Sequence, residues 1–548
     1  MSVDPRAGKP PTEEMLADLS KLEHAYYEEH PDPSRSSERV AFGTSGHRGS
    51  SIRRSFNEDH IVAITEAICD FREENGIFGP LYLGMDTHAL SVPAHSTAVE
   101  VLGARGVRVL VAPGGAYTPT PAVSRAIVTH NRDAGARADG IVITPSHNPP
   151  EDGGFKYNPP HGGPAESAIT SWIERRANDR LARAREQGPR RPAGKAPPTV
   201  ETYDFATRYV EDLKEAIDLE AIARVRPKLG VDPLGGASVE YWGRIGQRYG
   251  LDLTVVNRTV DKTFRFVPVD HDGRIRTDCS SPYAMANVLA QRSHFDVALA
   301  NDGDADRHGI VTPKAGLLPP NHYLCVAIDY LLQHRPAWPS AAAVAMTAVS
   351  SDLIRRVAER LGRRVVEVPV GFKWFVPGLH ERTLCFGGEE SAGASLLARD
   401  GSTWTTDKDG ILLALLAAEI VSVTGTDPAA YYARIDQALG PSFYERRDAP
   451  ASAATRDRLR ALRADDWSAP LLAGDSVRSR RTAAGNGADL GGLKVTTDHG
   501  WFAVRPSGTE DVYKVYAESF RSADHLQAII GEAIAGVGAL LGQCPCLS

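Results

Sequence analysis

Short apolar runs alternate with longer helical patterns along most of the chain. The first such unit begins with Leu81–Asp86, continues through a Ser-containing turn into a helical pattern from about Pro93, and ends in Val107–Val111. The same order of strand, turn, helix and strand recurs in residues 229–256 and 342–368. Repeated units of this kind predict mixed α/β domains, each centred on a covered sheet.

The C-terminal part follows a different plan. Apolar runs at 501–504 and 512–518 flank a loop, and a helical pattern over about 524–541 follows. We therefore expect an α/β protein with three similar mixed-sheet α/β domains and a smaller C-terminal α+β domain around a central active-site cleft. The expected segments are an N-terminal extension (1–38) and domains over 39–202, 203–315, 316–440 and 441–548.

Composition indicates three connecting stretches. Residues 180–199 are rich in Arg, Ala and Pro, which predicts an exposed connection after the first domain. Residues 449–462 are rich in Ala and Arg, and residues 483–492 are rich in Gly and Ala. We interpret these two as a hinge or an insertion before the last motif.

The overall composition is typical of a large globular enzyme, with 548 residues, 42% hydrophobic and 24% charged. With a net charge of −7, the chain lacks the excess of basic residues that is typical of a nucleic-acid-binding protein. No apolar run approaches the roughly 18 residues of a membrane span, and residues 1–30 lack the apolar block of a signal peptide. We expect a cytoplasmic protein, monomeric or homodimeric, with a small-molecule partner and neither nucleic acid nor membrane as partner. The six cysteines form no Cys-x-x-Cys pair and are expected to be free thiols, and Cys544 and Cys546 have no assigned role.

A nucleophile candidate lies in Thr144-Pro-Ser-His-Asn-Pro-Pro150, directly after the apolar run 140–143. That run predicts a buried strand, so Ser146 would lie on a Pro-stiffened loop at the strand's carboxyl end. Catalytic groups of open α/β sheets collect at this edge. A serine followed by a histidine is also common in an ordinary turn, which remains the alternative.

Three aspartates follow another predicted strand, 295–301, in the segment Asp302-Gly-Asp-Ala-Asp-Arg-His308. Their alternate spacing suits the binding of one divalent cation by oxygen ligands. An EF-hand is excluded because its sixth and twelfth positions would be Arg307 and Pro313 rather than Gly and Glu. A solvated surface turn is the alternative, although the apolar strand before it favours burial. A serine beside such a metal site is suited to phosphoryl transfer.

Three further segments are suited to a phosphosugar. Gly43-Thr-Ser-Gly-His-Arg-Gly49 and Val504-Arg-Pro-Ser-Gly-Thr-Glu510 combine hydroxyl, backbone N–H and guanidinium donors for phosphate oxygens. The first is not a Walker A loop, because the Lys-Ser/Thr ending is missing. In Phe386-Gly-Gly-Glu-Glu-Ser-Ala-Gly393, Glu389 and Ser391 are able to hydrogen-bond vicinal hydroxyls. Each segment by itself is also compatible with a plain turn.

These five motifs occur together in the order that is found in the α-D-phosphohexomutase superfamily, and the chain resembles that family from about Arg39 onward. Within the superfamily it is most similar to the bacterial phosphoglucomutases. The resemblance implies an enzyme that interconverts α-D-glucose 1-phosphate and glucose 6-phosphate through a phosphoserine and a glucose 1,6-bisphosphate intermediate. It also implies Mg²⁺ as the cofactor.

The resemblance assigns expected roles to individual residues. Ser146 would carry the phosphoryl group, with Arg48 beside it and Lys156 as a candidate proton shuttle. The residues expected at the metal are Asp302, Asp304, Asp306 and an oxygen of phosphorylated Ser146. The residues expected at the sugar and at its distal phosphate are Glu389, Ser391, Arg505, Ser507, Gly508 and Thr509, with Arg307 and Lys408 as further candidates for substrate contact.

The residues themselves leave some choices open. A desolvated Lys156 near Arg48 is expected to have a lowered pKa and to act as the base, with His147 and His308 as rivals. Phosphomannomutase or phosphoglucosamine mutase activity, a non-catalytic phosphosugar sensor and a phosphatase are the alternative functions. A sensor would be expected to have lost Ser146 or one of the aspartates, and all of them are present.

Overall fold

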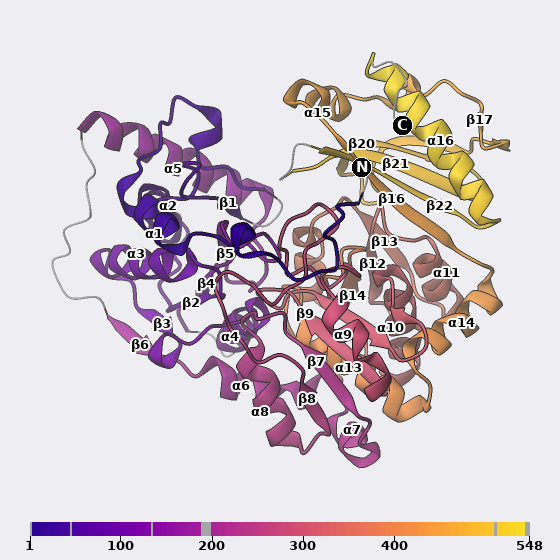
Figure 1. The fold of residues 1–548 in the computed structure, drawn as a ribbon, viewed down its shortest axis with the longest axis horizontal. Coiled ribbons are helices and arrows are strands. Elements are labelled where there is room, and N and C mark those ends of the chain that lie inside the picture. The colour runs from indigo at the N-terminus through magenta and orange to yellow at the C-terminus, as the bar shows by residue number, and fades with distance from the viewer. Residues whose placement is uncertain (1–2, 44–45, 133–134, 188–198, 509–511, 543–548) are drawn as a thin grey trace.

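The computed structural model describes residues 3–43, 46–132, 135–187, 199–508 and 512–542. It confirms the expected mixed α/β class, with four larger sheets one after another along the chain and a two-stranded sheet, β17-β18, beside the last (Figure 1). We refer to each larger sheet with its helices as the first to the fourth unit. The first three units share a continuous apolar core, which includes the buried helix α13 (Gly410–Thr424). The fourth unit has a separate core.

The first unit is built on a six-stranded sheet in the order β1-β5-β4-β2-β3-β6. Alternate side chains of its central strands point to opposite faces, because successive Cβ atoms of a strand do so. Leu83 and Ile141 pack with helices α2, α3 and α5, whereas Tyr82 and Val142 pack with α4. The bounds are β1 His47–Gly49, β2 Leu81–Met85, β3 Val109–Val111, β4 Asp139–Ile143, β5 Gly153–Asn158, β6 Val200–Thr202, α2 Glu58–Glu74, α3 Ser91–Ala104, α4 Thr120–Arg132 and α5 Ser167–Gln187.

The second and third units have sheets in the orders β11-β10-β9-β7-β8 and β13-β12-β14-β15. Their helices and strands are α6 Phe205–Asp212, α7 Leu219–Val225, β7 Leu229–Asp232, α8 Val239–Tyr249, β8 Leu253–Val255, α9 Ala286–Ala290, β9 Val297–Asn301, β10 His308–Thr312, β11 Gly316–Leu317, α10 Pro320–His334, β12 Ala343–Thr347, α11 Leu353–Arg360, β13 Val365–Val368, α12 Val376–His380, β14 Leu384–Gly388, β15 Ala394–Leu396 and α14 Pro428–Leu439. The three predicted strand, helix and strand repeats are β2-α3-β3, β7-α8-β8 and β12-α11-β13, and each strand pair is parallel.

The fourth unit is an antiparallel sheet in the order β16-β22-β21-β20-β19. One face, with Phe502 and Val515, packs under α15 and α16, and the other face contacts the third unit through Trp501 and Tyr516 against Val349. The bounds are β16 Phe443–Pro450, α15 Ala453–Arg460, β17 Leu471–Leu472, β18 Asp475–Ser476, β19 Ser479–Ala483, β20 Asp489–Thr496, β21 Gly500–Pro506, β22 Val512–Ser519 and α16 Ala523–Leu540.

The structure corrects two predicted connections. Residues 483–492 join β19 to β20 as a hairpin, and residues 449–462 contain the end of β16 and helix α15, so both stretches have regular structure rather than that of an open connection. Both stretches belong to the fourth unit, because they take part in its sheet pairing and in its apolar core. Helix α5 continues to Gln187, where Arg180 pairs with Glu66 and Asp70, so the predicted connection begins later than expected. Residues 188–198 lie outside the described residues.

The N-terminal segment 3–28 contacts two units. The backbones of Gly8 and Lys9 form hydrogen bonds with that of Val269 in the second unit, at 2.8 and 2.9 Å. Helix α1 (Leu19–Glu28) packs instead on the first unit, where Tyr26 Oη donates to Thr97 Oγ1 at 2.9 Å. The segment therefore connects the unit that contains Ser146 to the unit that contains the aspartates.

Several short 3₁₀ helices lie in the connections: Glu13–Met15, Ser36–Glu38, Pro113–Gly115, Leu213–Glu215, Arg292–His294, Phe372–Trp374 and Ala464–Asp466. Among the described residues, no single helix is long and apolar enough to cross a membrane. Helices α13 and α14 pass such a test together by length and composition, but they are bent by 76° at the break between them.

Candidate active site

The loop after β4 holds Ser146 in a buried position with an uncommon backbone conformation. Its φ angle is 64°, in the left-handed region that a non-glycine residue adopts at a cost of about 1–2 kcal/mol. The Ser146 backbone N–H donates to Thr144 Oγ1 at 2.8 Å, which holds the loop in this form. Its hydroxyl donates to Asp302 Oδ2 at 2.7 Å, across the boundary between the first and second units. The structure thus brings together the two motifs that the sequence analysis singled out.

The loop after β9 gathers the three predicted carboxylates, which are all buried. One oxygen from each of Asp302, Asp304 and Asp306 lies within 4.8 Å of the others. Asp304 Oδ1 and Asp306 Oδ1 are buried and have no hydrogen-bond partner among the described residues, although such atoms are normally satisfied in folded proteins. Three hard oxygen ligands with two unsatisfied atoms fit a divalent cation such as Mg²⁺.

The carboxylates differ in their electrostatic surroundings. Burial and the charges of Asp304 and Asp306 raise the pKa of Asp302 well above its usual value. Burial also acts to raise the pKa of Asp306, but Lys408 and Lys156 outweigh it and the net shift is downward. The cluster therefore combines a carboxyl that resists ionisation with one that stays ionised, and a bound cation would favour the ionised form of both.

Lys156, on β5, lies in the predicted place but not in the predicted state. Its Nζ donates to Asp304 Oδ2 at 2.6 Å and to Asp306 Oδ2 at 3.1 Å. Burial lowers the pKa of Lys156, but the two carboxylates outweigh burial, so the net shift is upward. The expectation of a lowered pKa is wrong, because the sequence does not tell which charges surround a buried lysine.

The two rival histidines are both held neutral. Burial, Arg307 and other positive groups lower the pKa of His147 well below its usual value, and its Nδ1 lies 3.4 Å from Ser146 Oγ. Burial lowers the pKa of His308 to about 3, and this ring packs against Tyr323. Of the two histidines considered as alternatives to Lys156 for the base, His147 is therefore the one that lies beside the Ser146 hydroxyl.

Two polar residues near the site had no signal in the sequence. Thr120 begins helix α4, and its Oγ1 donates to Asp304 Oδ2 at 2.5 Å while its backbone N–H donates to the Asp304 carbonyl at 2.9 Å. Asp278 is a partly buried carboxylate of the second unit. Burial acts to raise the pKa of Asp278, but the Arg307 guanidinium and the hydrogen bonds from Ser280 act against it and the net shift is downward. A Thr-Pro pair at the start of a helix and a lone aspartate are both common in proteins. Their place beside the site could therefore not be recognised from the sequence without the fold.

Two predicted arginines lie beside the serine and the aspartates. Arg48, on β1, is aligned with Gly154 of β5, and its Nη1 donates to Asn148 Oδ1 at 3.4 Å. The Arg307 backbone N–H donates to Asp302 Oδ1 at 3.0 Å, and its Nε lies 3.9 Å from carboxylate oxygens of Asp302 and Asp306. Both guanidinium groups are therefore near the predicted phosphoryl position.

The sugar-loop motif contacts the metal loop directly. Arg307 and Gly393 form an isolated antiparallel bridge, and the His308 N–H donates to the Ala392 carbonyl at 3.1 Å. Lys408 reaches Asp306 Oδ2 at 2.9 Å, and its stem crosses Gly393 so closely that a Cβ there would overlap the Lys408 Cδ. A larger residue at position 393 would therefore displace the Lys408 side chain.

The predicted sugar ligands lie at the same turn. Glu389 is buried, and its Oε1 accepts from the Gly371 N–H at 2.9 Å. Burial raises the pKa of Glu389 to about 7. Ser391 lies two residues further along and is half-buried.

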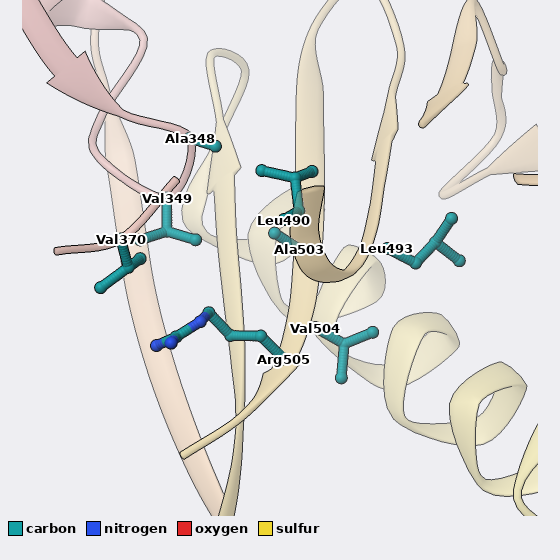
Figure 2. A pocket seen from close by; sticks show the side chains of 8 residues that line it. All are labelled: Ala348, Val349, Val370, Leu490, Leu493, Ala503, Val504 and Arg505. Carbon is teal, nitrogen blue, oxygen red and sulfur yellow. The ribbon is translucent and has the colours of Figure 1, made fainter. Parts of the chain in front are cut away.

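The C-terminal phosphate motif begins in the last residues of β21, where Arg505 lies beside the third unit. Figure 2 shows the Arg505 side chain extending from β21 toward Val349 and Val370. Ser507 is buried and its N–H donates to the Val512 carbonyl at 2.8 Å, whereas Gly508 is exposed. Thr509 lies outside the described residues, as do Cys544 and Cys546.

Four family profiles match the chain in order. They are described as phosphoglucomutase/phosphomannomutase alpha/beta/alpha domain I at residues 39–183, domain II at 207–316, domain III at 319–438 and the C-terminal domain at 470–535. The chain belongs to the phosphoglucomutase/phosphomannomutase family. It is 54% identical over 547 residues to a phosphoglucomutase of Komagataeibacter xylinus. The aligned region covers 99% of this chain and 98% of the relative.

More distant relatives share the same architecture. The chain is 26% identical to a phosphoglucosamine mutase of Desulforamulus reducens, over 91% of this chain and 99% of that protein. It is also similar to the crystal structure of a putative phosphomannomutase from Thermus thermophilus. That similarity has a TM-score of 0.71 and 26% identity, and it covers 92% of this chain and 98% of the other.

Proposed function

We propose that this chain is a phosphoglucomutase that interconverts α-D-glucose 1-phosphate and glucose 6-phosphate. Such an enzyme is an intramolecular phosphotransferase of the isomerase class. The observation that carries the proposal is the buried hydrogen bond of 2.7 Å from Ser146 Oγ to Asp302 Oδ2, which joins a nucleophilic hydroxyl to three carboxylates. The 54% identity with the Komagataeibacter xylinus phosphoglucomutase favours glucose among the hexose phosphates.

Asp302, Asp304, Asp306 and an oxygen of phosphorylated Ser146 are the proposed ligands of Mg²⁺. Bound there, the ion would offset negative charge on the phosphoryl group during its transfer. Lys156 stays protonated in this proposal and orients Asp304 and Asp306, to which it donates at 2.6 and 3.1 Å. Glucose 1,6-bisphosphate is both the proposed intermediate and the activator that first loads the serine. A cytoplasmic location and a monomeric or homodimeric state stay predictions.

In the first half-reaction, the bond between phosphorus and Ser146 Oγ breaks while O6 of glucose 1-phosphate, or O1 of glucose 6-phosphate, bonds to phosphorus. The product is the bisphosphate. We assign the proton transfer to His147, which is held neutral and lies 3.4 Å from Ser146 Oγ. It takes the proton from the sugar hydroxyl and passes it to Ser146 Oγ.

The second half-reaction reverses these steps from the other end of the sugar. After the bisphosphate turns over, its second phosphoryl group bonds to Ser146 Oγ, and the proton returns through His147 to the departing sugar oxygen. The site must therefore bind the sugar phosphate in a similar way in both orientations. We propose that Glu389 and Ser391 bind sugar hydroxyls, and that the groups for the distal phosphate are Arg505, Ser507, Gly508 and Thr509, with Arg48, Arg307 and Lys408 supplying further positive charge.

The proposal is tested by conversion of glucose 1-phosphate to glucose 6-phosphate with Mg²⁺ and a trace of glucose 1,6-bisphosphate. Wild type is compared with Ser146→Ala and with Ser96→Ala, which changes an exposed serine on α3. We expect turnover in wild type and in Ser96→Ala, and loss of turnover in Ser146→Ala. The intact mass of wild type should show one bound phosphoryl group. Absence of turnover in a phosphorylated wild type would point to mannose or glucosamine phosphates, to be assayed next, or to a sensor.

A further inference from the structure

His88 lies in the loop after β2, fully buried, and both of its ring nitrogens are hydrogen-bonded. Nδ1 is 2.8 Å from Asp86 Oδ2, and Nε2 is 2.9 Å from the backbone carbonyl oxygen of Asn148. A carboxylate oxygen and a carbonyl oxygen both accept hydrogen bonds, so each ring nitrogen must donate. Only the imidazolium form of His88 has a hydrogen on both nitrogens.

Asp86 connects this histidine to the other side of the serine loop. Its Oδ2 also accepts from Thr144 Oγ1 at 2.6 Å, and Thr144 Oγ1 in turn accepts from the Ser146 N–H at 2.8 Å. The loop is therefore held at residue 144 through Asp86 and at residue 148 through His88. Ser146 lies midway between these two attachments, and its φ of 64° needs such support.

The ring of His88 also touches the second unit. It packs edge to face against Phe264, with ring centroids 4.8 Å apart. Gly303, between two of the metal-loop aspartates, comes so close that a Cβ there would lie 2.6 Å from the Ser146 carbonyl oxygen and 3.1 Å from His88 Cε1. His88 is thus in contact with the serine loop, the metal loop and the apolar cluster around Phe264.

We propose that His88 is a positioning residue, a buried imidazolium whose Nε2–H holds the carbonyl of Asn148 and thereby sets Ser146 against Asp302. Its effect on turnover rests on the proposed function, whereas its protonation state does not. Lining up the nucleophile in this way acts on the rate of the chemical step, because a displacement of about 1 Å from reacting geometry costs on the order of 10²-fold.

The surroundings of His88 favour the charged ring. Burial lowers the pKa of His88, but the Asp86 carboxylate and the two hydrogen bonds outweigh burial, and the net shift is upward. Asp152, which accepts from Asn148 Nδ2 at 3.0 Å and pairs with Arg53, acts in the same direction. Phe264 and Gly303, on the side of the second unit, carry no charge that opposes it.

Two substitutions separate positioning from a merely structural role. In His88→Asn the amide nitrogen replaces Nδ1 and keeps the bond to Asp86, and in His88→Gln it replaces Nε2 and keeps the bond to Asn148. We expect kcat to fall about 100-fold in His88→Asn and tenfold or less in His88→Gln, with KM nearly unchanged in both. The melting temperature should follow the opposite order, because Asp86 keeps its partner only in His88→Asn.

The matched control is His24→Asn, on the exposed face of α1. It should match wild type in kcat and in melting temperature. Equal kcat in His88→Asn and wild type, or losses of kcat that simply follow the loss of folded protein, would overturn the positioning role.

A second measurement does not depend on activity or on a variant that folds. In the full-length enzyme labelled with ¹⁵N-histidine, both ring nitrogens of His88 should have imidazolium chemical shifts at pH 7, and the signals should be absent in His88→Gln. A neutral-tautomer signature for His88 would refute the proposal. If wild type converts no hexose phosphate but His88 is an imidazolium, the proposed function fails while the assignment of the histidine stands.

Discussion

Lys156 Nζ and Asp304 Oδ2 lie 2.6 Å apart in a buried ion pair that joins β5 of the first unit to the metal loop of the second. Asp306 Oδ2 is the second acceptor, at 3.1 Å. The ammonium group of Lys156 thus partly neutralises the carboxylate cluster, together with that of Lys408 at Asp306. It links the two halves of the proposed catalytic site through charge rather than through apolar packing.

Lys156→Met should destabilise the metal-free protein, because it leaves the buried Asp304 without its cation and Asp306 with Lys408 alone. Removal of one partner of a buried ion pair typically costs about 3–5 kcal/mol. The same variant should be stabilised more than wild type by Mg²⁺, since the ion then supplies the missing positive charge. Thermal melting of both proteins with and without Mg²⁺ checks this. A smaller or equal Mg²⁺ shift in the variant would contradict the proposed metal position.

Glu389 should make substrate binding dependent on pH near neutrality. Burial raises its pKa to about 7, so the side chain is ionised above that pH and becomes protonated as the pH falls through it. The carboxylate accepts more hydrogen bonds than the acid, so KM should rise severalfold between pH 8 and pH 6. Glu389→Gln is the control, because it removes this titration but not that of the substrate phosphate. Identical KM profiles in the two proteins would show that Glu389 does not bind sugar.

Gly393→Ala should displace Lys408 from Asp306, because the new methyl group would occupy the space of the lysine stem. We expect at least a tenfold loss of kcat/KM and a lower melting temperature. Gly243→Ala, inside helix α8 where a Cβ meets nothing within 4 Å, is the matched control. It should keep full activity and gain about 0.5–1 kcal/mol of stability, as glycine is unfavourable in a helix. Full activity of Gly393→Ala would mean that Lys408 is not needed at Asp306.

Removal of residues 1–17, which leaves helix α1 in place, should loosen the first unit from the second. The deletion removes the backbone hydrogen bonds of Gly8 and Lys9 to Val269 and the packing of Leu16 near Phe264. We expect kcat/KM to fall about tenfold and proteolysis between the units to become faster. Replacing residues 3–17 by a Gly/Ser sequence of equal length should have the same effect. Unchanged kinetics in both proteins would limit the segment to a role outside catalysis.

The repeated order of strand, helix and strand was predictable because it depends on local hydrophobic periodicity. The parallel pairs β2-β3, β7-β8 and β12-β13 lie where the apolar runs indicated. The hairpin at 483–492 was missed because a Gly- and Ala-rich composition is compatible with a linker as well as with a turn. Its role as a turn depends on the pairing of the flanking strands, which no local pattern contains.

The sequence by itself determined which motifs are candidates for the chemistry: a serine on a Pro-stiffened loop, three alternating aspartates, and Arg/Ser/Gly segments suited to phosphate. These follow from residue type and spacing. Only the tertiary structure decided that Ser146 meets Asp302, that Thr120 supports Asp304, and that both ring nitrogens of His88 face acceptor oxygens. The two carboxylates that raise the pKa of Lys156 were also brought to it by the tertiary structure. The physical reason is that hydrogen bonding and electrostatic energy depend on distance and burial. Distance and burial are set by the packing of residues that lie far apart in the chain.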